Sequence, residues 1–147
     1  MPDPFCTKEL FSKTIFYESK YFMVLYDIKP VVRGHTLIVP KRHILDFLEL
    51  NPEESADLHK VFDHVIPKIL SIYGATENSY DLTSQIGPYS GRTVTHLHIH
   101  IVPRAKNDEY QSESSNVYLD IKMNKTHFTM KDVGAEVARL RKEFGYK

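Results

Sequence analysis

The stretch 94-VTHLHIHIVPR-104 decides how the rest of the chain is interpreted. It holds three of the eight histidines at every second position: His96, His98 and His100. Successive side chains of a β-strand point to opposite faces of a sheet, so this spacing puts the three imidazoles on one face. The other face then takes the apolar residues between them, Leu97, Ile99 and Ile101. We therefore predict a strand over about 94–102, closed by Pro103, with its apolar face buried and its histidines facing a ligand.

A metal site is one explanation of three histidines, but the spacing disfavours it. Zinc bonds to imidazole nitrogen at about 2 Å. Each residue of a strand advances about 3.3 Å, so His96 and His100 start roughly 13 Å apart. Two histidines at this spacing can share an ion, but three on one straight strand can hardly do so, and the sequence around them offers no carboxylate or cysteine. We predict no dedicated metal site. Chance is also disfavoured, because the imidazoles are backed by apolar residues.

Catalysis is the remaining explanation. Neutral imidazole is a nucleophile near neutral pH, and imidazolium is a donor and an acid. The middle histidine could attack while its neighbours fix its tautomer or carry charge on the substrate. The loop 86-IGPYSG-91 lies just before the histidines, and its two glycines let the backbone approach a phosphate closely. This combination is typical of phosphoryl or nucleotidyl transfer.

The rest of the chain predicts one α+β domain of 147 residues. Further strands are expected at 14–18, 22–27, 35–39 and 79–85, which gives a five-stranded antiparallel sheet. The first helix begins with the cap pattern Asn51, Pro52 and Glu54, ends at Gly74, and should kink at Pro67. A second helix is expected at about 130–144, and the helices should pack on one face of the sheet. The polar stretch 105–117 predicts a mobile loop.

Composition narrows the function classes. Nineteen basic and nineteen acidic side chains balance, which argues against general nucleic-acid binding and against an acidic membrane surface. Cys6 is the only cysteine, so neither a disulfide framework nor a cysteine-based zinc site is expected. No stretch is long enough to span a bilayer, and the first residues lack the apolar core of a signal peptide. The expected location is the cytosol, with or without the nucleus.

The motif 96-HLHIHIV-102 resembles that of the histidine triad superfamily, His-φ-His-φ-His-φ-φ with φ apolar. The stretch 27-DIKPVVRGHTLIVPKRH-43 resembles the ribose-binding strand of that family and the turn into the next strand. The segment 85-QIGPYSGRTVTHLHIHIVPR-104 is most similar to the fragile-histidine-triad branch, the dinucleoside polyphosphate hydrolases. The resemblance is strong over about residues 5–104 and weaker in the C-terminal helix.

The resemblance implies an α+β homodimer whose sheets join through the long helix and neighbouring strands. It implies attack on the α-phosphorus of a nucleotide by His98, and a nucleotidyl-histidine that water then cleaves. Of His96 and His100, one would orient the nucleophile through its backbone carbonyl, and the other would contact phosphate oxygens or help the leaving group. His35 matches a further histidine near the triad, with either a structural or a direct role.

The resemblance also implies a substrate-binding set. Phe5, Leu25 and Leu37 match apolar positions around the purine. The remaining assignments are Asp27 to the ribose hydroxyls, Gln85 to the phosphate and the attacking water, Thr93 to a phosphate oxygen, Arg92 to the phosphates or solvent, and Tyr118 to a flexible loop. Two residues depart from the hydrolase branch, which often has Asn in place of Asp27 and usually has Gln in place of Arg92.

The leading interpretation is a hydrolase that splits dinucleoside polyphosphates such as diadenosine triphosphate into AMP and a second nucleotide. One alternative is a purine nucleoside phosphoramidase that cleaves AMP from nitrogen, which Asp27 slightly favours. The other is a nonenzymatic nucleotide-binding signalling module, against which the intact His98 argues. No tightly bound cofactor is expected, and a divalent ion (Mg or Mn) would arrive with the polyphosphate.

Overall fold

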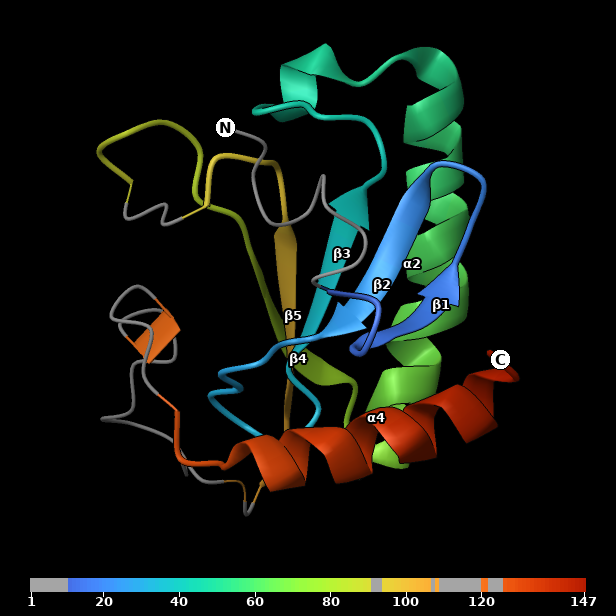
Figure 1. The fold of residues 1–147 in the computed structure, drawn as a ribbon, viewed down its shortest axis with the longest axis vertical. Coiled ribbons are helices and arrows are strands. Elements are labelled where there is room, and N and C mark those ends of the chain that lie inside the picture. Colours follow the sequence, from blue (N-terminus) through green and yellow to red (C-terminus); the bar gives the residue numbers. More distant parts are fainter. Residues whose placement is uncertain (1–10, 91–93, 107, 109–119, 122–125) are drawn as a thin grey trace.

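The computed structural model describes residues 11–90, 94–106, 108, 120–121 and 126–147. It contains one five-stranded antiparallel sheet with the strand order β1-β2-β3-β5-β4 (Figure 1). The strands are β1 (Ile15–Glu18), β2 (Phe22–Tyr26), β3 (Thr36–Pro40), β4 (Ser79–Thr83) and β5 (Ile99–Arg104). The predicted α+β class with an antiparallel sheet is confirmed.

Two long helices accompany the sheet, together with the short 3-10 helix η1 (Phe47–Glu49). Helix α2 (Pro52–Ile72) begins at the predicted cap, where the Asn51 side chain accepts from the Glu54 N–H and the Glu54 carboxylate accepts from the Asn51 N–H. Helix α4 (Met130–Phe144) occupies the predicted range and packs against β1 and β2. Figure 1 shows α2 running beside the strands and α4 crossing their lower end. In the part of the chain that the structure describes, no helix combines the length and apolar character that a membrane crossing requires.

Both faces of β2, β3 and β5 are buried, but the residues on the two faces belong to different clusters. The helix-side core joins one set of alternating strand residues to both helices, and includes Val24, Ile38, Ile99, Ile101, Val61, Val65, Val137 and Leu140. The residues in between form a smaller group, the histidine-side cluster: Ile15, Met23, Leu25, Leu37 and Val39. Leu37 pairs with His100 across β3 and β5, so this cluster shares its face of the sheet with that histidine.

The turn between β2 and β3 brings two parts of the chain into close approach. Gly34 has a φ of +97°, which favours glycine. A Cβ atom at this position would lie 2.7 Å from the Tyr73 ring and 2.8 Å from Pro103. The turn packs directly on the end of α2 and on β5, and for this reason no larger residue fits at Gly34. The following residue, His35, is thereby held next to β5.

The prediction for the histidine strand was partly wrong. Strand β5 begins at Ile99, so His96 and His98 precede it, and Pro103 lies within it rather than closing it. The strand predicted at 79–85 ends at Thr83, and α2 continues through Pro67 as one helix. Leu97, Ile99 and Ile101 are buried as predicted. Most of the loop predicted at 105–117 lies outside the described residues.

Candidate active site

His98 lies in the segment before β5, and hydrogen bonds hold both its ring and its backbone. The His98 Nδ1 atom lies 2.8 Å from the backbone carbonyl oxygen of His96. A carbonyl can only accept, so Nδ1 carries the hydrogen, and in the neutral ring the lone pair lies on Nε2. On the neighbouring chain segment, the Ser84 hydroxyl donates to the His98 carbonyl at 2.7 Å. The arrangement fixes the tautomer in which Nε2 is the basic and nucleophilic atom.

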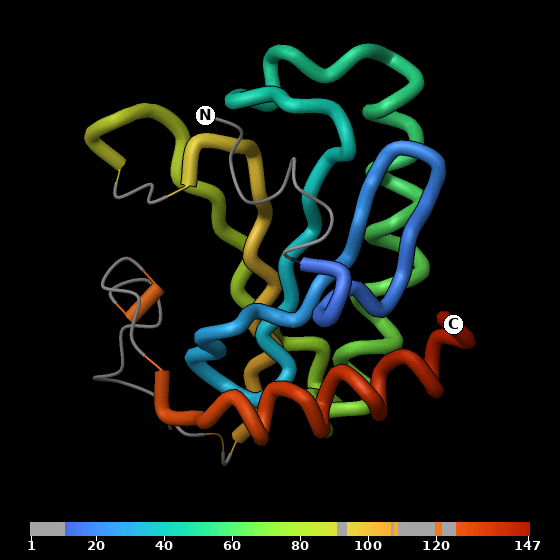
Figure 2. The backbone as a smooth tube through the Cα atoms, viewed as in Figure 1, coloured from blue at the N-terminus to red at the C-terminus, as the bar shows by residue number. Residues whose placement is uncertain are grey.

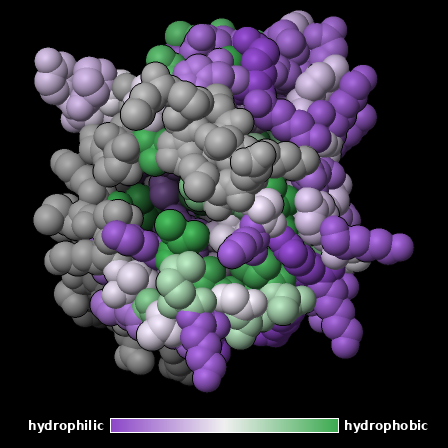
Figure 3. Space-filling view, in the orientation of Figure 1, coloured by the Kyte–Doolittle hydropathy of each residue, from purple (hydrophilic) through white to green (hydrophobic). Residues whose placement is uncertain are grey.

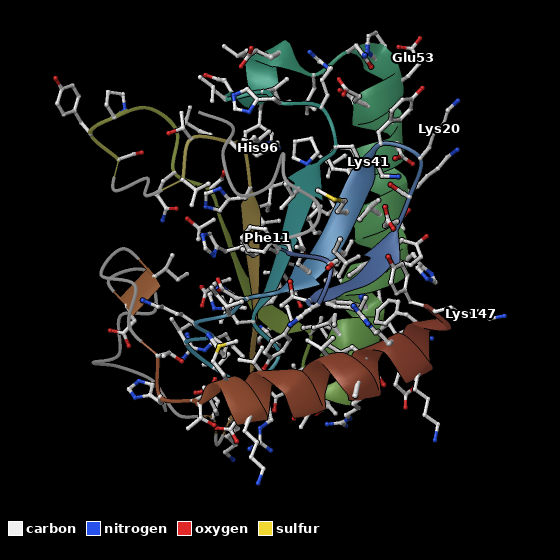
Figure 4. All side chains as sticks on the ribbon, in the orientation of Figure 1. Phe11, Lys20, Lys41, Glu53, His96 and Lys147 are labelled. Carbon is white, nitrogen blue, oxygen red and sulfur yellow. The ribbon has the colours of Figure 1, made fainter. Side chains whose placement is uncertain are left out.

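His96 is fully buried and is tied to the end of β3. Its Nε2–H donates to the Pro40 carbonyl oxygen at 2.9 Å, and the N–H of the next residue, Leu97, donates to the Ile44 carbonyl at 2.7 Å. Its ring meets the ring of His43 edge-on, with 5.1 Å between centroids. Figure 4 labels His96 at the end of the sheet where β3 finishes. The ring of His96 is therefore fixed by the segment 40–44, and its carbonyl oxygen is held where the His98 ring can donate to it.

His35 and His100 form a directed hydrogen-bond chain. The Val31 N–H donates to His35 Nδ1 at 3.1 Å, so that nitrogen is an acceptor and the hydrogen of His35 lies on Nε2. His35 Nε2 lies 2.8 Å from His100 Nδ1 and must be the donor of that pair. The hydrogen of neutral His100 is then on Nε2. The His100 ring also lies 5.1 Å from the His98 ring, between centroids, so a neutral N–H donor lies beside His98.

Asp27 lies next to this chain, although the sequence around the triad offers no carboxylate. Its Oδ2 atom is 3.3 Å from His35 Nε2 and 3.8 Å from His100 Nδ1. Its Oδ1 atom accepts from the Lys29 N–H at 2.8 Å. The three side chains could in principle offer ligands to a metal, since their donor atoms lie within 4.8 Å of one another.

The hydrogen bonds of these residues do not suit a divalent ion. His35 Nδ1 accepts from a backbone N–H, so a metal on Nε2 would require the doubly deprotonated ring. Zinc with ligands at about 2.0–2.1 Å places two nitrogens roughly 3.3 Å apart, which is longer than the 2.8 Å between His35 and His100. The geometry is that of a hydrogen-bonded pair.

Burial controls the charges of this group. Burial, together with the neighbouring His98, lowers the pKa of His35 to about 3. Burial, with a smaller contribution from the neighbouring His35, lowers the pKa of His100 to about 3 against the opposing effect of Asp27. Burial raises the pKa of Asp27, which His100 opposes. Both imidazoles are therefore neutral at pH 7, and they act as polar donors and acceptors rather than as cations.

Gln85 follows β4 and has an unsatisfied amide. Thr83 pairs with His100, and continuing this antiparallel register puts Gln85 opposite His98. The side chain is only 6% exposed, and its Nε2 atom has no hydrogen-bond partner among the described residues. A buried unpaired donor costs about 1–3 kcal/mol in the free protein. The amide is accordingly suited to an oxygen atom that a ligand brings.

The apolar residues assigned to the purine, Leu25 and Leu37, are buried in the histidine-side cluster, and Leu37 is the cross-strand partner of His100. Figure 3 shows a hollow on the viewed face with apolar side chains at its rim and a hydrophilic one at its floor. The other assigned residues, Phe5, Arg92, Thr93 and Tyr118, lie outside the described residues.

Several supports of the site were not predicted. Ser84 is an ordinary polar residue in sequence, and its bond to the His98 carbonyl depends on how β4 meets β5. The carbonyls of Pro40 and Ile44 and the N–H of Val31 are backbone atoms, which no residue type encodes. The sequence offered one signal for these groups, which is that they lie close along the chain to residues already assigned to substrate binding or catalysis.

The five-stranded sheet with four histidines gathered beside its central strands defines a class of protein. The HIT domain family model matches residues 9–107, and the chain belongs to this family. It is 41% identical over 101 residues to a bis(5'-adenosyl)-triphosphatase of Saccharomyces cerevisiae, an alignment that covers 68% of this chain and 48% of that protein. It is 33% identical over 110 residues to the asymmetrical bis(5'-nucleosyl)-tetraphosphatase of Schizosaccharomyces pombe, covering 75% and 58%.

The fold is also that of solved structures. The crystal structure of Plasmodium falciparum diadenosine triphosphate hydrolase in complex with cyclomarin A superposes with a TM-score of 0.70, covering 92% of this chain and 78% of that one, at 21% identity. That likeness concerns the fold alone. The chain spans about half the length of the Saccharomyces relative that it matches.

Proposed function

We propose that the protein hydrolyses dinucleoside polyphosphates, such as diadenosine triphosphate, to AMP and a second nucleotide. The observation that carries the proposal is the His98 Nδ1 contact with the His96 carbonyl, which places the nucleophilic lone pair on Nε2 beside a neutral His100. The named activities of the Saccharomyces and Schizosaccharomyces relatives support it.

The reaction has two displacements at phosphorus. His98 Nε2 attacks the α-phosphorus, a P–N bond forms, and the P–O bond to the remaining nucleotide breaks. The Nδ1–H of His98 stays bonded to the His96 carbonyl, whose dipole stabilises the positive charge that develops on the ring. A water oxygen then attacks phosphorus and loses a proton to solvent, the P–N bond breaks, AMP leaves and the imidazole regains its lone pair.

The neighbouring donors act on the oxygens around phosphorus. The Nε2–H of His100 donates to a phosphate oxygen or to the leaving oxygen, and His35 keeps the hydrogen on that nitrogen. The unpaired Gln85 amide donates to a phosphate oxygen or orients the attacking water. Since these donors are neutral and already placed, they need little rearrangement as charge develops.

Substrate binding follows the sequence assignments. Leu25 and Leu37, with Phe5, bind the purine, while Arg92 and Thr93 contact the phosphates. Asp27 accepts from ribose hydroxyls and also neighbours His35. Asp27→Ala should weaken binding of ribonucleotides more than of their 2′,3′-dideoxy counterparts; an equal loss for both would remove the ribose role. A divalent ion, where needed, rides on the polyphosphate.

Turnover of two substrates tests the hydrolase assignment against its alternatives. Diadenosine triphosphate should be cleaved with a higher kcat/KM than an AMP-lysine-type phosphoramidate. The reverse preference would make the protein a phosphoramidase, for which Asp27 is the supporting observation. Tight binding of both with negligible turnover would indicate a nucleotide-binding signalling module.

A homodimer joined through β4 completes the proposal. Strand β4 is at the edge of the sheet, and Tyr80 and Leu82 are 41% and 48% exposed. Leu82 pairs with Ile101, so it lies on the helix side of the sheet, where it is left half exposed. Light scattering should give the mass of two chains, and Leu82→Lys should give one; a wild-type monomer would contradict the dimer.

A further inference from the structure

The loop between β4 and β5 presents one aromatic ring to solvent. Tyr89 is 98% exposed, the highest value among the large hydrophobic side chains that the structure describes. The turn beneath it is closed: the Ser90 hydroxyl donates to the Gly87 carbonyl at 2.9 Å, Gly87 has a φ of +87°, and Pro88 fixes the next φ. The ring is therefore held out by a defined turn, and it adds nothing to the apolar core.

This turn is connected to the proposed catalytic residues at both ends. Tyr89 lies four residues after Gln85 and five after Ser84, whose hydroxyl holds the His98 carbonyl. On the other side, Val94 packs against the histidine-side cluster, and His96 follows two residues later. Figure 2 shows that the loop at 86–90 and the segment at 94–98 occupy the same end of the sheet. The turn that carries Tyr89 thus follows directly on the residues that adjoin His98.

A dinucleoside polyphosphate needs two places for its bases. The base of the nucleotide that becomes attached to His98 has the apolar residues Leu25 and Leu37. The second base leaves with the rest of the phosphate chain, so it needs a place of its own. Stacking on an exposed aromatic ring is the interaction that binds a base of any identity at such a place, because every base has a π-face.

We infer that Tyr89 is the stacking surface for the second nucleoside, the one that leaves with the polyphosphate. This inference rests on the proposed hydrolase function and extends it to a second subsite. Tyr89 selects substrates that carry a nucleoside at both ends over those with a bare or alkylated phosphate end. The phenol itself is dispensable for stacking, so phenylalanine should serve equally well.

The test compares diadenosine triphosphate with the γ-methyl ester of ATP, which has the same esterified triphosphate and charge but no second nucleoside. The measured quantity is the ratio of the two kcat/KM values. Tyr89→Ala should lower this ratio about fivefold or more, equivalent to about 1 kcal/mol, while Tyr89→Phe keeps it. Leu48→Ala, which removes another exposed side chain (91%) on η1, is the matched control and should keep the ratio. An unchanged ratio in Tyr89→Ala overturns the inference.

A binding measurement makes the inference independent of turnover. The chain contains no tryptophan, so Tyr89→Trp in a His98→Asn background provides a single tryptophan at the proposed subsite. Diadenosine triphosphate should quench its fluorescence saturably, and the methyl ester should not. Equal quenching by both ligands, or by neither, overturns the subsite. If the wild-type protein cleaves neither substrate, the hydrolase proposal fails instead, and the quenching experiment still decides whether the second base binds at Tyr89.

Discussion

Along the central strands the two faces of the sheet are both buried, and they differ in what fills them. On the helix side, Ile99 and Ile101 pack against aliphatic residues of the helices. On the other side, His98 and His100 alternate with them along the same segment and are nearly as buried. The difference lies in hydrogen bonding, since each buried imidazole is bonded to a backbone group or to another imidazole. Burial alone therefore does not distinguish core from site; the partners of the polar atoms do.

The largest effect is expected from a substitution that changes the histidine face of the sheet and leaves the helix-side core intact. His98→Asn removes the nucleophile and should lower kcat by roughly 10⁴-fold or more. Nucleotide binding should persist, because the purine and ribose contacts remain. Steady-state assays with equilibrium binding measure both. The exposed His59→Asn on α2 is the control and should keep wild-type rates, whereas near-normal rates in His98→Asn would refute the mechanism.

The neighbouring residue tests the opposite face. Ile99→Ala leaves a cavity in the helix-side core and should lower the free energy of unfolding by about 2–5 kcal/mol. Urea unfolding measures this loss. The folded fraction should retain kcat within a few fold at low temperature, because Ile99 points away from the imidazoles. A large loss of kcat at unchanged stability would show that the two faces are not separable in this way.

The buried imidazoles should make the histidine face sensitive to acid. The pKa of His35 is about 3 in the folded protein and ordinary, near 6.5, when unfolded. Between these values the unfolded chain binds the extra proton, so stability is full above pH 6.5 and falls as the pH drops. For each such histidine, the free energy of unfolding falls by about 1.4 kcal/mol per unit of decrease in pH within this window.

His35→Asn removes one of these protons while keeping an acceptor for the Val31 N–H. The free energy of unfolding, followed from pH 7.5 to 5 by urea denaturation, should fall less steeply than in the wild type, by up to about 1.4 kcal/mol per pH unit. Asp27, whose raised pKa acts in the opposite direction, is present in both proteins. Parallel pH curves for the two proteins would contradict the neutral, buried state of His35.

The smallest expected effect concerns Gln85, where a substitution should change activity and stability in opposite directions. Gln85→Met removes the buried, unpaired amide and should raise the free energy of unfolding by about 1 kcal/mol. It should also lower kcat/KM, because the donor for a phosphate oxygen or for water is lost. Thermal unfolding and steady-state kinetics check the two signs. A variant that is both less stable and fully active would show that the amide serves the fold.

Local patterns predicted much of this molecule. Alternation assigned Leu97, Ile99 and Ile101 to the core, and the Asn51–Glu54 capping box located the start of α2. The start of β5 was misplaced because pairing with β3 extends only to Ile38 and Ile99. Before that point the backbone bonds elsewhere, with Leu97 donating to Ile44. Periodicity describes side chains and does not reveal where a strand loses its partner.

The triad histidines and His35, which the sequence analysis assigned to the site, lie together, but the sequence did not predict the hydrogen bonds that connect them. His35 and His100 lie 65 residues apart in sequence, and their hydrogen bond depends on the turn at Gly34 packing against β5. The approach of Asp27 to the same pair follows from that turn as well. The direction of the proton chain is set by the Val31 N–H, a backbone group that no motif encodes.

The central claim is that His98 becomes covalently attached to the nucleotide. Wild-type protein mixed with diadenosine triphosphate, quenched in alkali to preserve the P–N bond and digested, should yield one peptide that carries an adenylyl group. Fragmentation in the mass spectrometer should place that group on His98, and His98→Asn should give no adduct. An adenylyl group on His96 or on His100, or continued turnover by His98→Asn, would contradict the account.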